Sequence, residues 1–141
     1  MQSKSEERTP PTVLVVDDEA PMRALERRVL EALGYSVLEA TNGADLVDLL
    51  AQGVHFDLLI ADLNMPVVRG DEMARRIRRS RPGLRVLYAT GHADWLMDGR
   101  ALLQGEALLA KPFSAEQLRD AVSLLLTSAP GPENPSKVSS D

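Results

Sequence analysis

Five short apolar segments recur along the chain, and most are continuous rather than alternating with polar residues. They lie at residues 13–16, 37–38, 58–61, 86–89 and 107–110. Continuous apolar runs of this length are typical of parallel strands that helices cover on both faces. The 37–38 run is the shortest and lies between Ser36 and Glu39, so we expect it at an edge of the sheet.

Apolar residues at helical spacing fill the intervals between these segments. The first stripe runs from Leu25 to Leu33, with Pro21 near its start and Gly34 just past its end. Further stripes lie at 46–50 after the capping residue Asn42, at 73–77 before Pro82-Gly83, weakly at 93–103, and at 118–125 after the capping box of Ser114 and Gln117. Strands that alternate with helices in this way predict a parallel α/β sheet with right-handed crossovers.

The two ends of the chain are predicted to lie outside this folded unit. Residues 1–11 are charged and end in two prolines, and residues 128–141 are rich in proline and serine, so we expect both to be disordered. The folded domain is therefore expected at residues 12–127. The chain has 141 residues, which suits one domain with its own core.

Composition excludes several classes of protein. The chain has no cysteine, which excludes a disulfide scaffold, a thiol enzyme and a Cys-ligated metal site. A formal net charge of −5 does not favour nucleic-acid binding, and we interpret the arginine-rich segment 75–81 as a solvated surface. No apolar run approaches the roughly 20 residues of a membrane span, and the N-terminus lacks the apolar stretch of a signal peptide. We therefore expect a cytoplasmic protein with no membrane partner.

Polar side chains end four of the five predicted strands. Asp17-Asp18 end the first strand, Asp62 the third, Thr90 the fourth and Lys111 the fifth. Because the carboxyl ends of parallel strands share one edge of the sheet, we expect these groups to lie together. Singly, each has an ordinary explanation, such as a helix cap for the aspartate pair or a solvated charge for the lysine. Four compatible strand ends together favour a functional site.

The expected cluster has the chemistry of a magnesium site. Three carboxylates at one place repel each other, so a cation must compensate them. Oxygen ligands without histidine or cysteine favour Mg²⁺. Together with Lys111, this ion would balance the three negative charges and admit an anionic phosphoryl group. A carboxylate nucleophile, Mg²⁺, a lysine and a hydroxyl are the parts that phosphoryl transfer requires.

The segments VLVVDDE, LLIADLNMP, VLYATG and LLAKPF resemble the receiver domain of two-component response regulators, the CheY-like family. The resemblance covers residues 12–127 and extends to receivers of hybrid histidine kinases. It implies a doubly wound (βα)5 flavodoxin-like three-layer sandwich, with a parallel sheet in the order 2-1-3-4-5. It also implies a role in a phosphorelay, with a histidine kinase or histidine phosphotransfer protein as the phosphoryl donor.

The resemblance also implies how the signal leaves the domain. A downstream protein would bind the face formed by the 93–103 helix, the 107–110 strand and the last helix. We expect no DNA-binding module and no enzyme activity beyond self-phosphorylation and slow self-dephosphorylation.

The resemblance assigns roles to individual residues. Asp62 would be the phosphoacceptor. Asp18 and Asp62 would ligate Mg²⁺ directly, Asp17 would act through water, and Asn64 would act through its backbone carbonyl.

The same resemblance implies that Thr90 hydrogen-bonds the phosphoryl group and that Lys111 pairs with it, with a cis Lys111–Pro112 bond. Most receivers carry an aromatic residue where this chain has Leu108, so we hypothesise that movement of the 90–105 segment reports phosphorylation. Gly91 would leave the phosphoryl pocket open, and His92 with Asn64 would flank the opening and influence the phosphoryl lifetime.

Two other functions fit parts of the sequence. One is a pseudo-receiver, a docking module that works without phosphorylation, although the intact Asp18, Asp62 and Lys111 argue against it. The other is an enzyme or nucleotide carrier of similar topology, such as a flavin protein. The acidic residues after the first strand would repel phosphate without a metal, and no glycine-rich phosphate-binding motif is present.

Overall fold

The computed structural model describes residues 10–65, 68–91 and 102–127. Five parallel strands form one sheet in the order β2-β1-β3-β4-β5. The strands are β1 (Thr12–Val16), β2 (Ser36–Ala40), β3 (Leu58–Asp62), β4 (Val86–Thr90) and β5 (Glu106–Ala110). The helices are α2 (Ala20–Ala32), α3 (Gly43–Ala51), α4 (Gly70–Ser80) and α5 (Ala115–Thr127).

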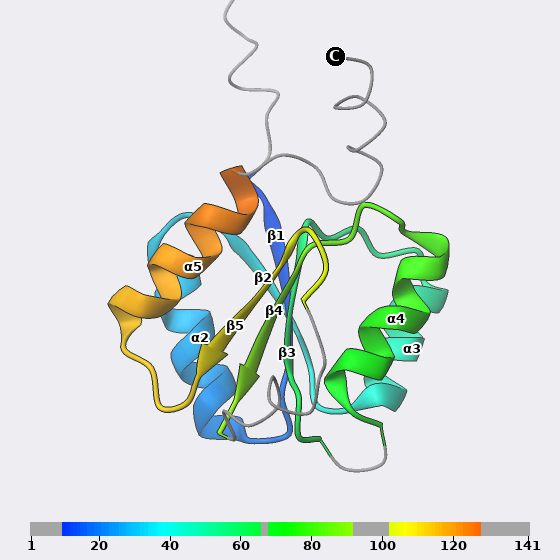
Figure 1. Ribbon diagram of the computed structural model, residues 1–141, viewed down its shortest axis with the longest axis horizontal. Coiled ribbons are helices and arrows are strands. Elements are labelled where there is room, and N and C mark those ends of the chain that lie inside the picture. The colour runs from blue at the N-terminus through cyan, green and yellow to red at the C-terminus, as the bar shows by residue number, and fades with distance from the viewer. Residues whose placement is uncertain (1–9, 66–67, 92–101, 128–141) are drawn as a thin grey trace, which may run out of the picture.

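Helices cover both faces of the sheet and make three layers (Figure 1). α2 and α5 lie on one face, and α3 and α4 lie on the other. The predicted fold class and strand order are therefore confirmed.

The side chains of β1 show why the strands are continuous in apolar residues. Leu14 and Val16 pack toward α3 and α4, whereas Val13 and Val15 pack toward α2 and α5. All four side chains are fully buried because both faces of the strand are covered. Strands β3 and β4 are buried along their whole length for the same reason.

Strand β2 lies at an edge of the sheet, as predicted, but it is longer than its apolar run. It pairs with β1 from Ser36 to Ala40, rather than only over residues 37–38. Ser36 and Glu39 are exposed while Val37 is buried. Because β2 lies at the edge of the sheet, polar residues are tolerated within it. The apolar run at 37–38 therefore predicted a strand that is too short.

Side-chain capping bonds mark the starts of α3 and α5. The Asn42 side chain accepts a hydrogen bond from the Asp45 N–H at the start of α3. Ser114 and Gln117 exchange two side-chain-to-backbone bonds, of 3.0 and 2.8 Å, before α5. Leu33 was expected within the apolar stripe of α2, but it follows the helix and is 38% exposed.

The weak helix expected at 93–103 lies mostly outside the described residues. Leu102 and Leu103 are described, and they are not helical. The Leu103 carbonyl accepts a hydrogen bond from the Glu106 N–H in the turn before β5, so the expected helix does not reach residue 103. Among the helices that the structure describes, none is both long and apolar enough to cross a bilayer.

Glu26 on α2 is buried, and the sequence analysis did not single it out. The residue is 1% exposed, and neither carboxylate oxygen has a hydrogen-bond partner. Burial raises the pKa of Glu26 to about 8, and the negative charge of Asp17 adds to this effect. Glu26 lies one helical turn from both Met22 and Leu30, so it stands on the apolar stripe of α2.

We expect Glu26→Leu to stabilise the protein at and above neutral pH. The pKa of Glu26 rises from about 4.5 in the unfolded chain to about 8 in the folded protein, so its contribution to stability is present below pH 4.5 and is lost as the pH rises through 8. Leucine cannot ionise, so the variant avoids the fall in unfolding free energy that ionisation of Glu26 causes, on the order of a few kcal/mol at about pH 8. Urea unfolding in a metal chelator, between about pH 5 and pH 8, measures the effect.

Glu31→Leu, on the exposed part of the same helix, is the matched control for this substitution. It should leave the pH dependence of the unfolding free energy unchanged. If Glu26→Leu and the wild type lost stability in parallel as the pH rises, the assigned role of Glu26 would be wrong.

Candidate functional site

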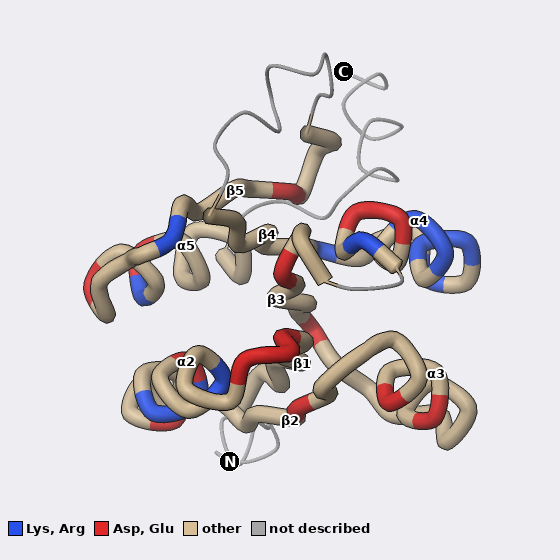
Figure 2. Tube along the Cα trace, turned by 90° about the horizontal axis from the view of Figure 1, so that it is seen from below, with Lys and Arg blue, Asp and Glu red and all other residues tan. Residues whose placement is uncertain are grey.

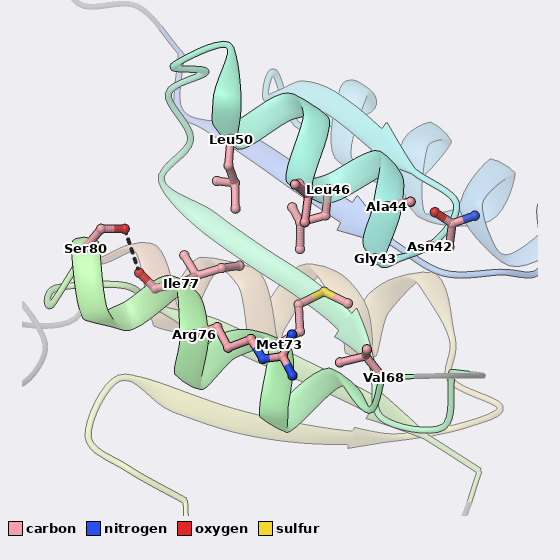
Figure 3. A pocket seen from close by; sticks show the side chains of 11 residues that line it. Asn42, Gly43, Ala44, Leu46, Leu50, Val68, Met73, Arg76, Ile77 and Ser80 are labelled. Atoms are coloured by element: carbon pink, nitrogen blue, oxygen red, sulfur yellow. Dashed lines mark hydrogen bonds between the residues drawn. The ribbon is translucent and has the colours of Figure 1, made fainter.

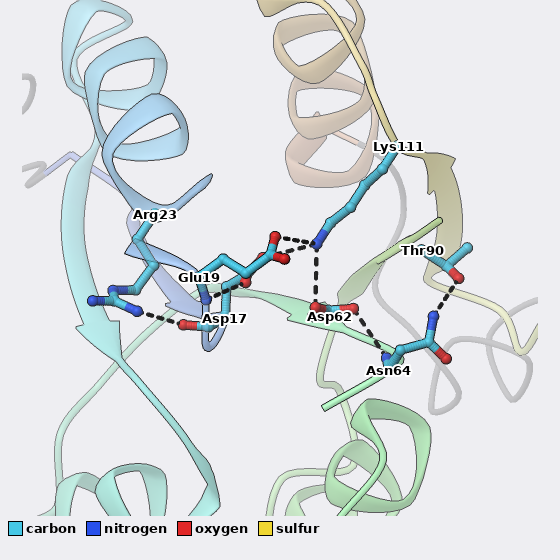
Figure 4. A network of polar contacts seen from close by, with 7 residues as sticks. All are labelled: Asp17, Glu19, Arg23, Asp62, Asn64, Thr90 and Lys111. Atoms are coloured by element: carbon cyan, nitrogen blue, oxygen red, sulfur yellow. Dashed lines mark hydrogen bonds and ion pairs between the residues drawn. The ribbon is translucent and has the colours of Figure 1, made fainter. Parts of the chain in front are cut away.

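The predicted polar residues meet at one edge of the sheet, which Figure 2 shows from the carboxyl ends of the strands. Asp17 directly follows β1, Asp62 ends β3, Thr90 ends β4 and Lys111 directly follows β5. Because the strands are parallel and adjacent, these four side chains come together although they are far apart in sequence (Figure 4).

The ammonium group of Lys111 lies at the centre of the cluster. Its Nζ is 3.2 Å from Asp17 Oδ2, 3.1 Å from Asp62 Oδ2 and 3.8 Å from Glu19 Oε1. Burial lowers the pKa of Lys111, but the negative charges of Asp17 and Asp62 outweigh burial and leave that pKa raised. Lys111 is therefore charged at neutral pH, and it links the end of β5 to β1 and β3.

Asp17 is 1% exposed, and each of its two carboxylate oxygens has a partner that holds the side chain in place. Oδ1 accepts the Glu19 N–H at 2.9 Å, while Oδ2 contacts Lys111. Burial raises the pKa of Asp17, and the Glu19 N–H and Lys111 oppose this effect without cancelling it. The Asp17 backbone carbonyl accepts a bond from Arg23 at 2.7 Å. The cap residue of α2 is Glu19, without a side-chain bond, so helix capping does not explain Asp17.

Asp62 is also buried, at 6% exposure, and its two oxygens have different partners. Oδ1 accepts the Asn64 N–H at 3.0 Å, and Oδ2 faces Lys111. The Asn64 side chain donates to the Thr90 hydroxyl at 3.0 Å, a contact that the sequence analysis did not anticipate. This bond ties the turn after β3 to the end of β4.

Three carboxylates are placed so that they could share a cation. Asp17, Asp18 and Asp62 each offer an oxygen, and these oxygens lie within 4.8 Å of one another. Asp17 and Asp62 are buried while Asp18 is exposed, so the group is reached from solvent. A donor set of carboxylate oxygens alone suits a hard divalent cation.

Comparison with known proteins agrees with this geometry. The response regulator receiver domain family matches residues 13–123. The chain belongs to this family. The response regulator receiver protein CpdR of Brucella abortus is 32% identical over 118 residues, which cover 83% of this receiver and 98% of CpdR.

A second relative is much longer than this receiver. The sensor kinase CckA of Brucella abortus is 30% identical over 117 residues, which cover 82% of this chain but 12% of the kinase. This receiver therefore spans about an eighth of the length of that kinase. Among solved structures, the response regulator TrrA of Thermotoga maritima, in complex with Mg²⁺ and BeF, matches with a TM-score of 0.71 and 28% identity, over 82% of this chain and 99% of TrrA.

The remaining predicted site residues of the receiver lie near the cluster or outside the described part. Gly91 is exposed, and an added Cβ there would meet no atom within 4 Å. Leu108 is half-buried on β5 and packs against the apolar cluster under α3 and α4. The Lys111–Pro112 bond is cis, as the resemblance implied. His92 lies outside the described residues.

Gly70 places α4 directly on the end of β3 in the receiver, and the sequence analysis missed it. A Cβ at Gly70 would lie 2.5 Å from the Asp62 carbonyl oxygen, closer than real Cβ contacts allow. The Gly70 N–H also donates to the Leu63 carbonyl at 3.3 Å. Only glycine permits this approach, and the approach sets the backbone that carries Asp62. The glycine before a helical stripe was visible in the sequence, but its contact was not.

We expect Gly70→Ala to destabilise the receiver by about 2 kcal/mol, because the new methyl group must push α4 away from β3. Gly43→Ala is the matched control, since Gly43 also begins a helix and its Cβ would lie 3.5 Å from Met73 Cε, an ordinary contact. Urea unfolding of both variants measures the difference. Equal stabilities for the two variants would contradict the close approach of α4 to β3.

Proposed function

We propose that this receiver accepts a phosphoryl group on Asp62 from a phosphohistidine of a histidine kinase or histidine phosphotransfer protein. The environment of the Asp62 carboxylate carries this proposal. It is buried at the end of β3, with the Lys111 ammonium 3.1 Å from one oxygen and the Asn64 N–H 3.0 Å from the other. The similarity to the sensor kinase CckA supports a partner of the histidine kinase class.

The transfer forms one bond and breaks another. An oxygen of Asp62 attacks the phosphorus atom, the P–O bond forms as the P–N bond to the histidine breaks, and the leaving imidazole takes a proton from water. Both the nucleophile and the phosphoryl group are negative, so transfer requires fixed positive charge. Lys111 supplies part of that charge by pairing with the phosphoryl group, and the Thr90 hydroxyl donates a hydrogen bond to it.

The cofactor in this proposal is Mg²⁺. Asp18 and Asp62 would hold it directly, Asp17 through water, and Asn64 through its backbone carbonyl. The three carboxylate oxygens within 4.8 Å of one another support this assignment, as does the Mg²⁺ complex of TrrA. When bound, Mg²⁺ neutralises and orients the phosphoryl oxygens. Three carboxylates, Mg²⁺ and Lys111 then balance in charge, so the incoming anion is not repelled.

Output in this proposal passes through the end of β4. Thr90 is bonded to Asn64 at 3.0 Å, so a shift of Thr90 toward the phosphoryl group would move the chain on both sides of it. Leu108 stands where an aromatic residue is usual, and the 90–105 segment would report the change instead. The face formed by this segment, β5 and α5 would bind a downstream protein. Gly91 would leave the phosphoryl pocket open, and Asn64 and His92 would flank the opening and influence the phosphoryl lifetime.

We expect wild-type protein to gain one phosphoryl group, about 80 Da, when incubated with acetyl phosphate and Mg²⁺. Asp62→Asn should abolish the adduct, because an amide is not a nucleophile for this transfer. Asp48→Asn, an exposed aspartate on α3, should leave it unchanged. Intact-mass spectrometry reads out each protein. No labelling of wild type would favour a pseudo-receiver, and equal labelling of Asp62→Asn and wild type would show that Asp62 is not the acceptor.

We expect Lys111→Met to bind Mg²⁺ more tightly than wild type, by roughly tenfold, while accepting the phosphoryl group more slowly. The Lys111 ammonium contacts the carboxylates of Asp17 and Asp62, two of the three residues that could share a cation, so its positive charge opposes a divalent ion there. Isothermal titration calorimetry measures the affinity, with Arg119→Met as an exposed cation control. Weaker binding by Lys111→Met would mean that the lysine organises the carboxylates for the metal.

A further inference from the structure

The two helix pairs of the fold are packed differently. On one face α2 and α5 pack closely against each other, whereas α3 and α4 approach each other less closely on the other face. A groove of about 520 Å³ lies between α3 and α4 (Figure 3). Leu46, Met73 and Ile77 from the core line it, with Leu50 and Val68 toward its ends. The groove is therefore an apolar surface that the described chain leaves open.

The polar side chains along the groove already have partners within the chain. Asn42 accepts the Asp45 N–H, and the Ser80 hydroxyl donates to the Ile77 carbonyl. Arg76 pairs with Glu72 at 2.9 Å. A polar small molecule would find few free hydrogen-bonding groups here, whereas apolar side chains would find a matching surface.

Positive charge borders this apolar groove on one side. Arg76 lines the groove, and α4 also exposes Arg79 and Arg75, which do not line it. Figure 2 shows red and blue segments along α4. Arg75 and Arg79 make no ion pair within the described ranges of the chain. On the α3 side, Val47 is 63% exposed at the groove, so the apolar surface extends to the rim. An occupant must therefore combine an apolar stripe with negative charge beside it.

We propose that this groove docks an amphipathic helix of a partner protein, with acidic residues flanking the apolar stripe of that helix. Its apolar side chains, at every third or fourth position, would enter between α3 and α4, and its acidic flank would face Arg76 and Arg79. The arginines alone would also suit nucleic acid, but phosphate groups would leave the apolar groove uncovered. The groove contains none of the residues assigned to phosphorylation, so this inference does not rest on the proposed function.

A designed peptide tests the groove with the full chain. The probe is a fluorescent helical peptide of about 16 residues, with leucine at every third or fourth position and glutamate on one flank. The control peptide has the same sequence with lysine in place of each glutamate. Fluorescence anisotropy should show saturable binding of the glutamate peptide, with a Kd on the order of 10 μM, and binding of the lysine peptide at least about tenfold weaker. Arg79→Glu should reverse this preference.

Two matched substitutions locate the binding surface. Val47→Ser should weaken binding of the glutamate peptide by about tenfold, whereas Leu124→Ser, an equally exposed apolar residue on α5, should change it less than about twofold. The proposal is overturned if the peptide does not saturate, if both peptides bind equally, or if Leu124→Ser weakens binding as much as Val47→Ser. It is also overturned if wild type is a dimer that Val47→Ser dissociates, since a second copy would then occupy the groove.

Discussion

Asp17 and Asp62 share one cation, Lys111, at the edge where the strands end, and the rest of the site depends on this shared contact. Two carboxylates buried side by side without a cation would cost several kcal/mol, and the Lys111 ammonium group offsets part of this cost. The same contact links β5 to β1 and β3. Asp18 adds a third negative charge that the lysine does not balance, and this excess favours a divalent cation and, through it, an anionic group.

Two residues that the sequence analysis did not single out, Glu26 and Gly70, lie close to this edge. Glu26 adds another carboxyl group to the negative surroundings of Asp17, and it has no hydrogen-bond partner of its own. Its raised pKa means that it resists ionisation, so it does not add a full charge to the site at neutral pH. Gly70 gives up a side chain so that α4 can lie against the Asp62 backbone.

The two faces of the sheet differ in how their helices pack. The α2–α5 face is closed by helix packing and carries much of the core, while the α3–α4 face keeps an apolar groove beside a basic helix. The proposed phosphorylation site lies at the edge between these faces, where α2 begins beyond Asp18 and α4 begins beyond Asp62. A partner on the α3–α4 face would therefore contact an element, α4, whose first residue, Gly70, lies against the Asp62 backbone.

The amino-acid sequence by itself determined the sheet, its buried strands and the gathering of Asp17, Asp18, Asp62, Thr90 and Lys111. The spacing of apolar residues and the polar residues at the strand ends can be read from local sequence. Because the strands pair in parallel, their carboxyl ends then lie along one edge of the sheet. Only the tertiary structure decided the Asn64–Thr90 bond, the burial of Glu26, the approach of Gly70 to β3 and the groove beside α4. Each of these depends on the distance between elements far apart in the chain, and packing sets that distance rather than any pattern along one segment.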